Sequence, residues 1–254
     1  MKRRLAVSCG ALALALLVGG CASVPAGGAA PTAAQKSDPW EAWNRKVFAF
    51  NDAVDNAVVK PVAEGYNKVV PQLVRTGIGN VFGNIGDVWS TANQFLQGKV
   101  QYGFEMTMRV LVNTLFGLGG LLDPATEMRL TRKSEDFGQT LGRWGMPPGP
   151  YLVLPFLGPS DLRDGVGLAV DLHVASPSRL ADTTAGAYEI SALQLVHTRA
   201  DLLATTQLVG EVALDRYSFI RDAYLQRRLD QVYDGAPPLE NFDDSDDTPP
   251  PKKQ

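Results

Sequence analysis

Hydrophobic side chains recur at intervals of three and four positions along most of the chain, and this spacing predicts helices with one apolar side. The first series consists of Trp40, Trp43, Val47, Phe50 and Val54. Asp38 is predicted to cap this helix, with Pro39 at its first position and Glu41 completing a capping box. The helix should end at Lys60-Pro61, because proline lacks the N–H that a helix needs, and Pro71 should mark a second break.

Two longer helical patterns follow. One resumes after Pro71 and runs to Gln97, with Gly98 as its end. The other, residues 100–116, is the most apolar helical pattern, and Arg109 and Asn113 are its polar exceptions, four positions apart.

The second half of the chain predicts shorter elements. A short helix should run from Ser134 to Gly145. Prolines at both ends of residues 147–159 exclude a helix there, so this apolar segment is interpreted as the one extended piece. Ser160 is predicted to cap a helix that reaches about Leu172, and two more helices are expected near residues 187–206 and 208–233. The pattern therefore predicts an all-α fold with connections rich in glycine and proline.

The N-terminal residues have the order of a secretion signal. Lys2-Arg3-Arg4 precedes an apolar run from Leu5 to Val18, and two glycines follow. Because Cys21 comes directly after these small residues, residues 1–20 are predicted to be a lipoprotein signal peptide, and Cys21 the residue that is acylated after cleavage. Alanine rather than aspartate at Ala22 favours the outer membrane of a bacterial cell.

Composition divides the rest of the chain into three parts. Residues 21–37, rich in Ala, Gly and Pro, are interpreted as a lipidated flexible tether. Residues 38–235 are predicted to be a helical domain, and residues 236–254, dominated by Pro, Asp and Lys, a disordered tail. Since Cys9 would leave with the signal, the domain is expected to contain no thiol.

Charge and hydropathy exclude two classes of protein. The chain has 24 basic and 27 acidic side chains, and loss of Lys2, Arg3 and Arg4 with the signal would bring the net charge to −6. Because basic residues form no stripe, nucleic acid is not expected as a partner. No apolar segment after the signal reaches the roughly 20 residues of a membrane-spanning helix.

Patterns typical of catalysis or metal binding are also absent from the sequence. His173 and His197 have no ligand partners at metal-binding spacing, and His197 with Asp201 is interpreted as a local helical pair at or near the surface. Residues 158–162 lack the closing glycine of a nucleophile elbow. The Asp-Leu-Arg-Asp run at residues 161–164 is interpreted as a solvated helix start with a local ion pair. We therefore expect neither a cofactor nor an enzymatic activity.

Several motifs together resemble one bacterial family. They are Asp38–Asp52, Lys60–Ala63, Asn80–Gly98, Arg109–Asp123, Asp136–Gly142, Gly149–Tyr151, Leu154-Pro155 and Leu162–Asp164. In this order, and after a lipobox, they resemble the VacJ/MlaA lipoprotein family over roughly residues 38–230.

The resemblance implies a compact, ring-like, all-helical body in the outer membrane with a polar channel. It implies that the protein removes phospholipid mislocalised in the outer leaflet and passes it to a periplasmic lipid-carrier protein, which maintains lipid asymmetry without catalysis. A trimeric outer-membrane porin is the implied partner in the membrane. Two alternatives remain open: a periplasm-facing scaffold lipoprotein without lipid transfer, and a lipid hydrolase of unfamiliar type.

The glycine-rich segment after the most apolar helix suggests where a lipid path could be shaped. Gly117, Gly119 and Gly120 loosen the backbone, and Asp123-Pro124 stiffens it again. Gly117–Asp123 is therefore predicted to be a moving or shaping element of the lipid path. The alternative is a simple tight turn.

Arg109 and Asn113 share one side of the preceding helix and are predicted to add polar lining near this segment. Polar groups within an apolar helix are costly unless they pair or line water, and an arginine could hold a lipid phosphate by charge-assisted hydrogen bonds. The alternative for Arg109 is an internal pair with a carboxylate such as Glu105.

Overall fold

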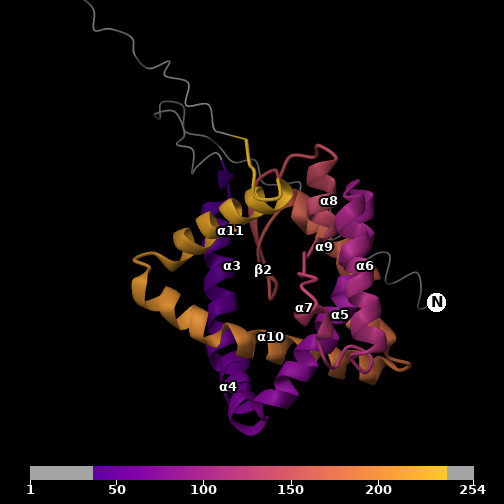
Figure 1. The fold of residues 1–254 in the computed structure, drawn as a ribbon. Coiled ribbons are helices and arrows are strands. Elements are labelled where there is room, and N and C mark those ends of the chain that lie inside the picture. The colour runs from indigo at the N-terminus through magenta and orange to yellow at the C-terminus, as the bar shows by residue number, and fades with distance from the viewer. Residues whose placement is uncertain (1–36, 239–254) are drawn as a thin grey trace, which may run out of the picture. The chain divides into compact units, whose positions relative to one another are not determined.

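A computed structural model describes residues 37–238, which form one body of helices with a single two-stranded sheet (Figure 1). The predicted signal peptide, Cys21, nearly all of the tether and most of the tail lie outside the described residues. The helical elements are α3 (Glu41–Val54), the π-helix η1 (Asp55–Val59), α4 (Lys60–Val69), α5 (Gln72–Leu96), α6 (Val100–Leu115), α7 (Pro124–Glu127), α8 (Phe137–Arg143), α9 (Leu162–Val174), the 3-10 helix η2 (Pro177–Leu180), α10 (Thr184–Val212) and α11 (Arg216–Val232). The strands are β1 (Tyr151–Leu154) and β2 (Gly158–Asp161), so the predicted all-α class is confirmed with one small addition.

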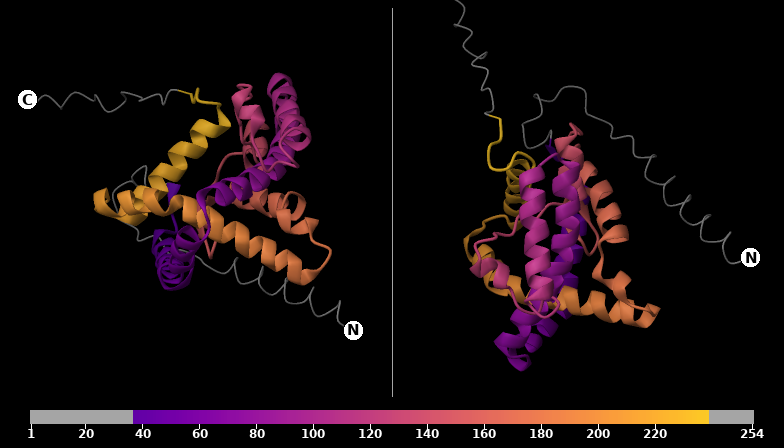
Figure 2. Two further views of the ribbon diagram at one scale, coloured as in Figure 1. Left: turned by 60° about the horizontal axis from the view of Figure 1, so that its bottom comes forward. Right: turned by 45° about the vertical axis from the view of Figure 1, so that its right-hand side comes forward.

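Contacts between the elements form a closed circuit within this body. Helix α3 continues through η1 into α4, α4 packs on α10, and α10 contacts α5. Helix α5 packs along α6 and also contacts α8, which contacts α11, and α11 leads through β2 and β1 back to α3. Figure 1 shows this circuit, and Figure 2 shows α5 and α6 side by side. The ring-like arrangement that the resemblance implied is therefore present.

Polar side chains fill much of the interior. Among residues 37–238, buried polar and charged side chains outnumber buried hydrophobic ones. The buried residues of α5 are all polar or glycine, namely Gly77, Asn84, Asp87, Ser90, Asn93 and Gln94. Many large apolar side chains of α3, α5 and α6 are exposed instead. None of the described helices is both long and apolar enough to cross a membrane on its own. The hydrophobic periodicity thus predicts helices correctly, while their apolar sides point outward.

The start of α3 differs from the prediction. Trp40 is its N-terminal cap and makes no side-chain capping bond. Asp38 is buried instead, where it accepts hydrogen bonds from Asn44 Nδ2 (2.8 Å) and Tyr217 Oη and lies 3.5 Å from Arg221 Nη1. The Asp38 carboxylate, which the local pattern predicts as a helix cap, is therefore bound by residues of α11, far away in the sequence.

The predicted break at Lys60-Pro61 is wrong. The helical path continues from α3 through η1 into α4 without a turn, and the N–H of Lys60 bonds to the carbonyl of Asp55, five positions earlier. Widening the helix just before the proline relieves the clash that its ring would make in a regular α-helix. Pro71 does separate two helices, as predicted.

The free edge of β1 is bonded by asparagine side chains of α3. Asn44 Nδ2 donates to the carbonyl of Tyr151 (3.0 Å), and the N–H of Val153 donates to Asn44 Oδ1 (2.9 Å). Two turns further along α3, the Asn51 amide repeats the pattern, donating to the carbonyl of Leu154 (2.9 Å) and accepting from the N–H two residues further on (2.8 Å). The two amides thus replace a neighbouring strand.

Helix caps in the second half also differ from the prediction. Strand β1 and the first half of β2 fall within the extended segment predicted at residues 147–159, but Ser160, predicted as a helix cap, lies in β2. The cap of α9 is Asp161, whose carboxylate accepts from the N–H of Asp164 (2.7 Å). Helix α8 is capped by Asp136 rather than begun at Ser134. The break between the last two helices falls after Val212, so α10 is longer than predicted.

Candidate functional site

The guanidinium of Arg109, in the middle of α6, is buried among oxygen atoms from four other residues. Nε donates to Asp87 Oδ2 (3.1 Å) and Nη2 to Asp123 Oδ2 (2.5 Å). Nη1 donates to Thr126 Oγ1 (3.0 Å) and to the carbonyl of Leu130 (2.5 Å). The side chain therefore joins α6 to α5 and to the segment that carries α7, and all three of its nitrogen atoms are bonded to protein.

Glu105 is not the partner of Arg109. Its carboxylate accepts from Lys133 Nζ (3.3 Å) and Gln101 Nε2 (3.0 Å) on the outside of α6. The alternative of an internal ion pair for Arg109 is therefore present. Its carboxylate partners are Asp87 and Asp123 rather than Glu105.

Asn113 and Asp123 extend the same cluster. Asn113 Nδ2 donates to Asp123 Oδ1 (2.9 Å), while the N–H of Ala125 donates to Asn113 Oδ1 (3.0 Å). Asp123 also caps α7 through Thr126. Burial alone would raise the pKa of Asp123, but hydrogen bonds from Thr126, Asn113 and Arg109 hold that pKa below its ordinary value. The carboxylate is therefore ionised at neutral pH.

Asp87 on α5 forms the inner end of the cluster. It is buried, and its Oδ2 accepts hydrogen bonds from Arg109 Nε and Arg132 Nε (3.1 Å each). Burial raises the pKa of Asp87 above its ordinary value, although both arginines oppose that rise. The hydrophobic pattern alone does not single out Asp87 as a functional residue. Its signal is the spacing of Asn80, Asn84 and Asp87, which places three polar side chains on one side of the helix.

The glycine segment is a hydrogen-bonded turn at the end of α6. The N–H groups of Gly119 and Gly120 donate to the carbonyls of Thr114 (3.0 Å) and Asn113 (2.9 Å). Gly119 and Gly120 have positive φ values of 73° and 94°. Leu118, which precedes them, is also left-handed, with a φ of 56°. This bonding pattern closes the helix end and requires glycine or strain.

Gly117 is required for a different reason. A Cβ at this position would lie 2.4 Å from the carbonyl oxygen of Asn113 and 2.5 Å from that of Leu122. Both contacts are with backbone, so a side chain could not be accommodated without moving the turn.

Two asparagines of α5 hold the other side of the turn. Asn80 Nδ2 donates to the carbonyl of Leu121 (3.0 Å), and Asn84 Nδ2 donates to Thr114 Oγ1 (3.1 Å). The Leu121 side chain lies against Gly77 and lines an apolar cavity of about 310 Å³ between α5, η2 and α10. Asparagine side chains of α5 thus bond one side of the turn, while apolar side chains lie on its other side. Leu118, in the middle of the turn, is 73% exposed.

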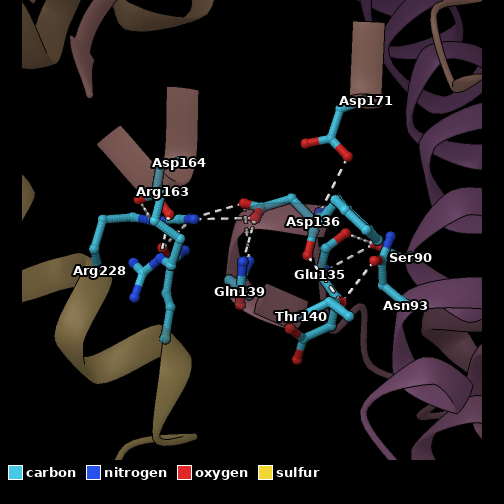
Figure 3. Close-up of polar contacts among 12 residues, drawn as sticks. Ser90, Asn93, Glu135, Asp136, Gln139, Thr140, Arg163, Asp164, Asp171 and Arg228 are labelled. Carbon is cyan, nitrogen blue, oxygen red and sulfur yellow. Dashed lines mark hydrogen bonds and ion pairs between the residues drawn. The ribbon is translucent and has the colours of Figure 1, made fainter. Parts of the chain in front are cut away.

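A second polar cluster connects α8, α9 and α11 (Figure 3). Arg228 on α11 donates to both oxygens of Asp136 (2.6 and 3.0 Å) and to Asp164 Oδ2 (2.5 Å). Asp164 also accepts from Arg163 Nε (2.9 Å) and Tyr224 Oη (2.7 Å). The helix start and the local ion pair predicted at residues 161–164 are present. The predicted solvation is wrong, because the charged side chains of this run are buried against α11.

The pKa values of the two carboxylates of that run are shifted in opposite directions. Burial raises the pKa of Asp161 to about 6, since few donors reach this side chain. Burial would raise the pKa of Asp164 as well, but hydrogen bonds from Arg228 and Arg163 lower it to about 2. The cluster therefore has one firmly ionised carboxylate and one that titrates in a weakly acidic range.

His197 is more buried than predicted, with 7% of its surface exposed. Its ring lies 3.4 Å from Asp201, which is the predicted local pair, and 3.3 Å from Tyr66 Oη. In residues 37–238, no group of three or more His, Cys, Asp or Glu side chains is placed to hold a metal ion.

Comparison with known proteins gives one consistent family. The family model described as MlaA lipoprotein matches residues 36–231. The Intermembrane phospholipid transport system lipoprotein MlaA of Escherichia coli (strain K12) is 36% identical over 232 residues, covering 89% of this chain and 88% of that protein. The protein of the same name from Haemophilus influenzae is 32% identical over 205 residues, covering 79% and 81%. An uncharacterized protein of Rickettsia bellii is 33% identical over 193 residues, covering 75% of each chain.

A solved structure is also similar. It is described as "Structural basis for maintenance of bacterial outer membrane lipid asymmetry", and it aligns with a TM-score of 0.68 and 35% sequence identity. The alignment covers 77% of this chain and 99% of the other. The fold described above is thus that of the aligned protein as well.

Proposed function

The chain belongs to the MlaA lipoprotein family, and we propose on this basis that it removes phospholipid mislocalised in the outer leaflet of the outer membrane and passes it to a periplasmic lipid-carrier protein. Such transfer maintains the difference in composition between the two leaflets. It makes and breaks no covalent bond, so no catalytic residue is proposed.

One structural observation carries this proposal: the interior of the body is polar and many of its large apolar side chains face outward. A phospholipid headgroup has to cross about 30 Å of hydrocarbon, which strongly opposes the passage of charge. A protein lowers this barrier if it offers polar groups to the headgroup and an apolar surface to the membrane. Helix α5 has this arrangement, with asparagines and an aspartate inside and Leu73, Val74 and Val88 exposed.

The same observation supports a body embedded in the outer membrane in addition to the lipid anchor at Cys21. Trp40 at the N-cap of α3 and Trp43 and Phe50 within it are exposed apolar side chains, although Phe50 contacts the ring of Phe156 in the turn between β1 and β2. A Cys21→Ser variant without acylation should therefore still require detergent to remain in solution. If that variant is freely soluble and monomeric, the alternative of a periplasm-facing scaffold lipoprotein is favoured instead.

We propose that Gly117–Asp123 shapes the lipid path, and that Arg109 and Asn113 act on it through Asp123 rather than by touching lipid directly. The support is the geometry of the turn. Its leucines are exposed, while Arg109 and Asn113 bind the Asp123 carboxylate from the interior. Movement of Leu121 would open or close the apolar cavity that it lines.

The test is replacement of Gly119 and Gly120 by alanine in a strain that lacks the native copy. Loss of outer-leaflet phospholipid clearance, at normal protein level and normal association with a trimeric porin, is the expected result. Gly86→Ala is the matched control, because a Cβ there meets nothing within 4 Å and its backbone is helical. Full clearance by a well-folded double variant would reject the role of the turn, and release of fatty acid from vesicles would favour the hydrolase alternative.

A further inference from the structure

Two neighbouring cavities between α3, η1, α4 and α10 differ in chemistry. One, of about 270 Å³, is lined mostly by charged and polar side chains of these helices and by Arg216 at the start of α11. The other, of about 340 Å³, is lined mainly by apolar side chains, including Val54, Val59 and Leu202, and by the turn between β1 and β2. Small-molecule sites usually have volumes of roughly 300–1,000 Å³, so the two together are of a suitable size for a ligand.

The ion pair of Asp55 and Arg199 belongs to both linings and forms the boundary between the cavities. Arg199 Nε and Nη2 donate to the two oxygens of Asp55 over 2.7 and 2.8 Å. This bidentate pair is satisfied internally, so it marks the place where a polar compartment changes to an apolar one.

The polar cavity has charges of both signs that no other described side chain bonds, although the Glu64 carboxylate helps to raise the pKa of the nearby Arg199. Lys60 and Glu64, one turn apart on α4, make no hydrogen bond or ion pair with another side chain in the described part of the chain. Arg216 Nη1 is bonded to Asp52 (3.0 Å), but its Nε is buried and has no hydrogen-bond partner. A ligand with an anionic and a cationic group would complete these contacts, whereas a simple anion would leave Glu64 unpaired.

The π-helix η1 lies between the two cavities. Asp55 at its start lines both, and Val59 at its end lines the apolar one. Short π-helical insertions are frequent at functional sites, because they redirect side chains that a regular helix would place elsewhere. The insertion therefore provides a local reason why charged and apolar side chains of one helical path face adjoining cavities.

We propose that these two cavities form one binding site for a single phospholipid with a zwitterionic headgroup, such as phosphatidylethanolamine. Lys60 and Arg216 bind the phosphate, Glu64 binds the ammonium group, and an acyl chain occupies the apolar cavity beyond the Asp55–Arg199 pair. This inference rests on the proposed function and adds to it a location and a headgroup preference.

The experiment measures binding of tritium-labelled phosphatidylethanolamine or phosphatidylglycerol to the purified full chain in detergent micelles. Glu64→Gln should weaken phosphatidylethanolamine binding about tenfold, the value of one charge-assisted hydrogen bond, and leave phosphatidylglycerol binding unchanged. Lys60→Ala should weaken both lipids. Lys68→Ala is the matched control, since Lys68 is an exposed lysine two turns further along α4 and lines neither cavity.

A second pair of variants tests the apolar compartment. Leu202→Trp fills it and should weaken both lipids, whereas Leu208→Trp, also exposed on α10 but outside both linings, should have no effect. Glycerophosphoethanolamine, which has the headgroup without the chains, should compete poorly. Equal competition by this molecule would overturn the two-part site.

The outcomes separate the two proposals. If the unmodified chain binds lipid but Glu64→Gln and Lys60→Ala bind it equally well, the site is wrong and the proposed function stands. If the unmodified chain binds neither lipid, the proposed site and the proposed function are both contradicted. Because Lys60 and Glu64 are exposed, these substitutions leave the fold intact.

Discussion

Arg109 Nη2 and Asp123 Oδ2 lie 2.5 Å apart, although fourteen positions separate the two residues. The bond connects the buried side of α6 to the end of the exposed glycine turn. Because Asp123 also caps α7, one carboxylate fixes both where the turn ends and where the next helix begins. The position of the turn therefore depends on a side chain that no lipid needs to touch.

Replacing Arg109 by methionine should destabilise the protein by about 3 kcal/mol, because truncating one member of a buried ion network leaves its partners poorly compensated. Asp87 would retain only Arg132. The measurement is denaturant unfolding of the purified chain in detergent. Arg129→Met is the control and should change stability by less than about 0.5 kcal/mol, because Arg129 is exposed. Equal stability of the two variants would contradict the anchoring role of Arg109.

Alanine at the three glycines of the turn should destabilise in a fixed order. Gly119→Ala should be mildest, at about 1 kcal/mol, since it adds left-handed strain without a contact. Gly120→Ala adds an approach of 2.8 Å to Asn84 Nδ2, and Gly117→Ala meets backbone oxygens and should cost most. Thermal unfolding of the three variants checks the order. A Gly117 variant more stable than the Gly119 variant would show that the turn relaxes freely.

Asn44→Ala should lower the free energy of unfolding by about 2–3 kcal/mol, because it leaves buried backbone groups of β1 and the Asp38 carboxylate short of partners. Asn51→Ala should cost about 1 kcal/mol, since that residue is only partly buried. Asn56→Ala, at an exposed position that bonds only within its own helix, serves as the control. Equal free energies of unfolding for all three variants would contradict the conclusion that Asn44 and Asn51 replace a neighbouring strand at the edge of β1.

Stability should depend on pH through Asp161. Its folded pKa of about 6 lies above the value of about 3.9 for an unfolded chain, so the folded state binds the proton more tightly. The contribution to stability is full below pH 4 and is lost as the pH rises through 6. Asp164, with its pKa lowered to about 2, contributes in the opposite sense, above pH 4, and loses that contribution as the pH falls through 2.

Unfolding midpoints measured between pH 3 and 8 test this dependence. Asp161→Asn keeps an acceptor for the cap of α9 and should remove the loss of stability between about pH 4 and 6. Unfolding of Asp161→Asn with the same pH profile as the unmodified chain would assign the titration to another group.

Local sequence signals predict the bounds of the central helices well. The predicted helices at residues 71–97 and 100–116 correspond to α5 and α6 within one or two residues. Pro71 and Gly98 set these bounds locally, the first by lacking an N–H and the second by a φ of 76°. Arg109, Asn113 and Asp123 lie together because they follow each other within a helix and the turn after it, while their role in a lipid path stays a prediction.

Long-range partners explain the errors. The local pattern predicts Asp38 as a helix cap and the charged run at residues 161–164 as solvated. In the structure, Tyr217 binds Asp38 from 179 positions away, and Tyr224 binds Asp164 from 60 positions away. Periodicity indicates which side of a helix is apolar but not what covers it. The outward apolar side of α3 and the missed Asp87 both follow from that ambiguity.

The burial of Asp38 against Tyr217 and Arg221 also sets an order of events during folding. A chain emerging N-terminus first cannot cover this carboxylate until α11 has been delivered, and loop closure over so many residues is entropically slow. The circuit therefore closes last, at a seam between its first and final helices. Until then Asp38 lacks its partners on α11, and loss of α11 by truncation would remove Tyr217 and Arg221 from Asp38. It would also remove Tyr224 and Arg228 from Asp164.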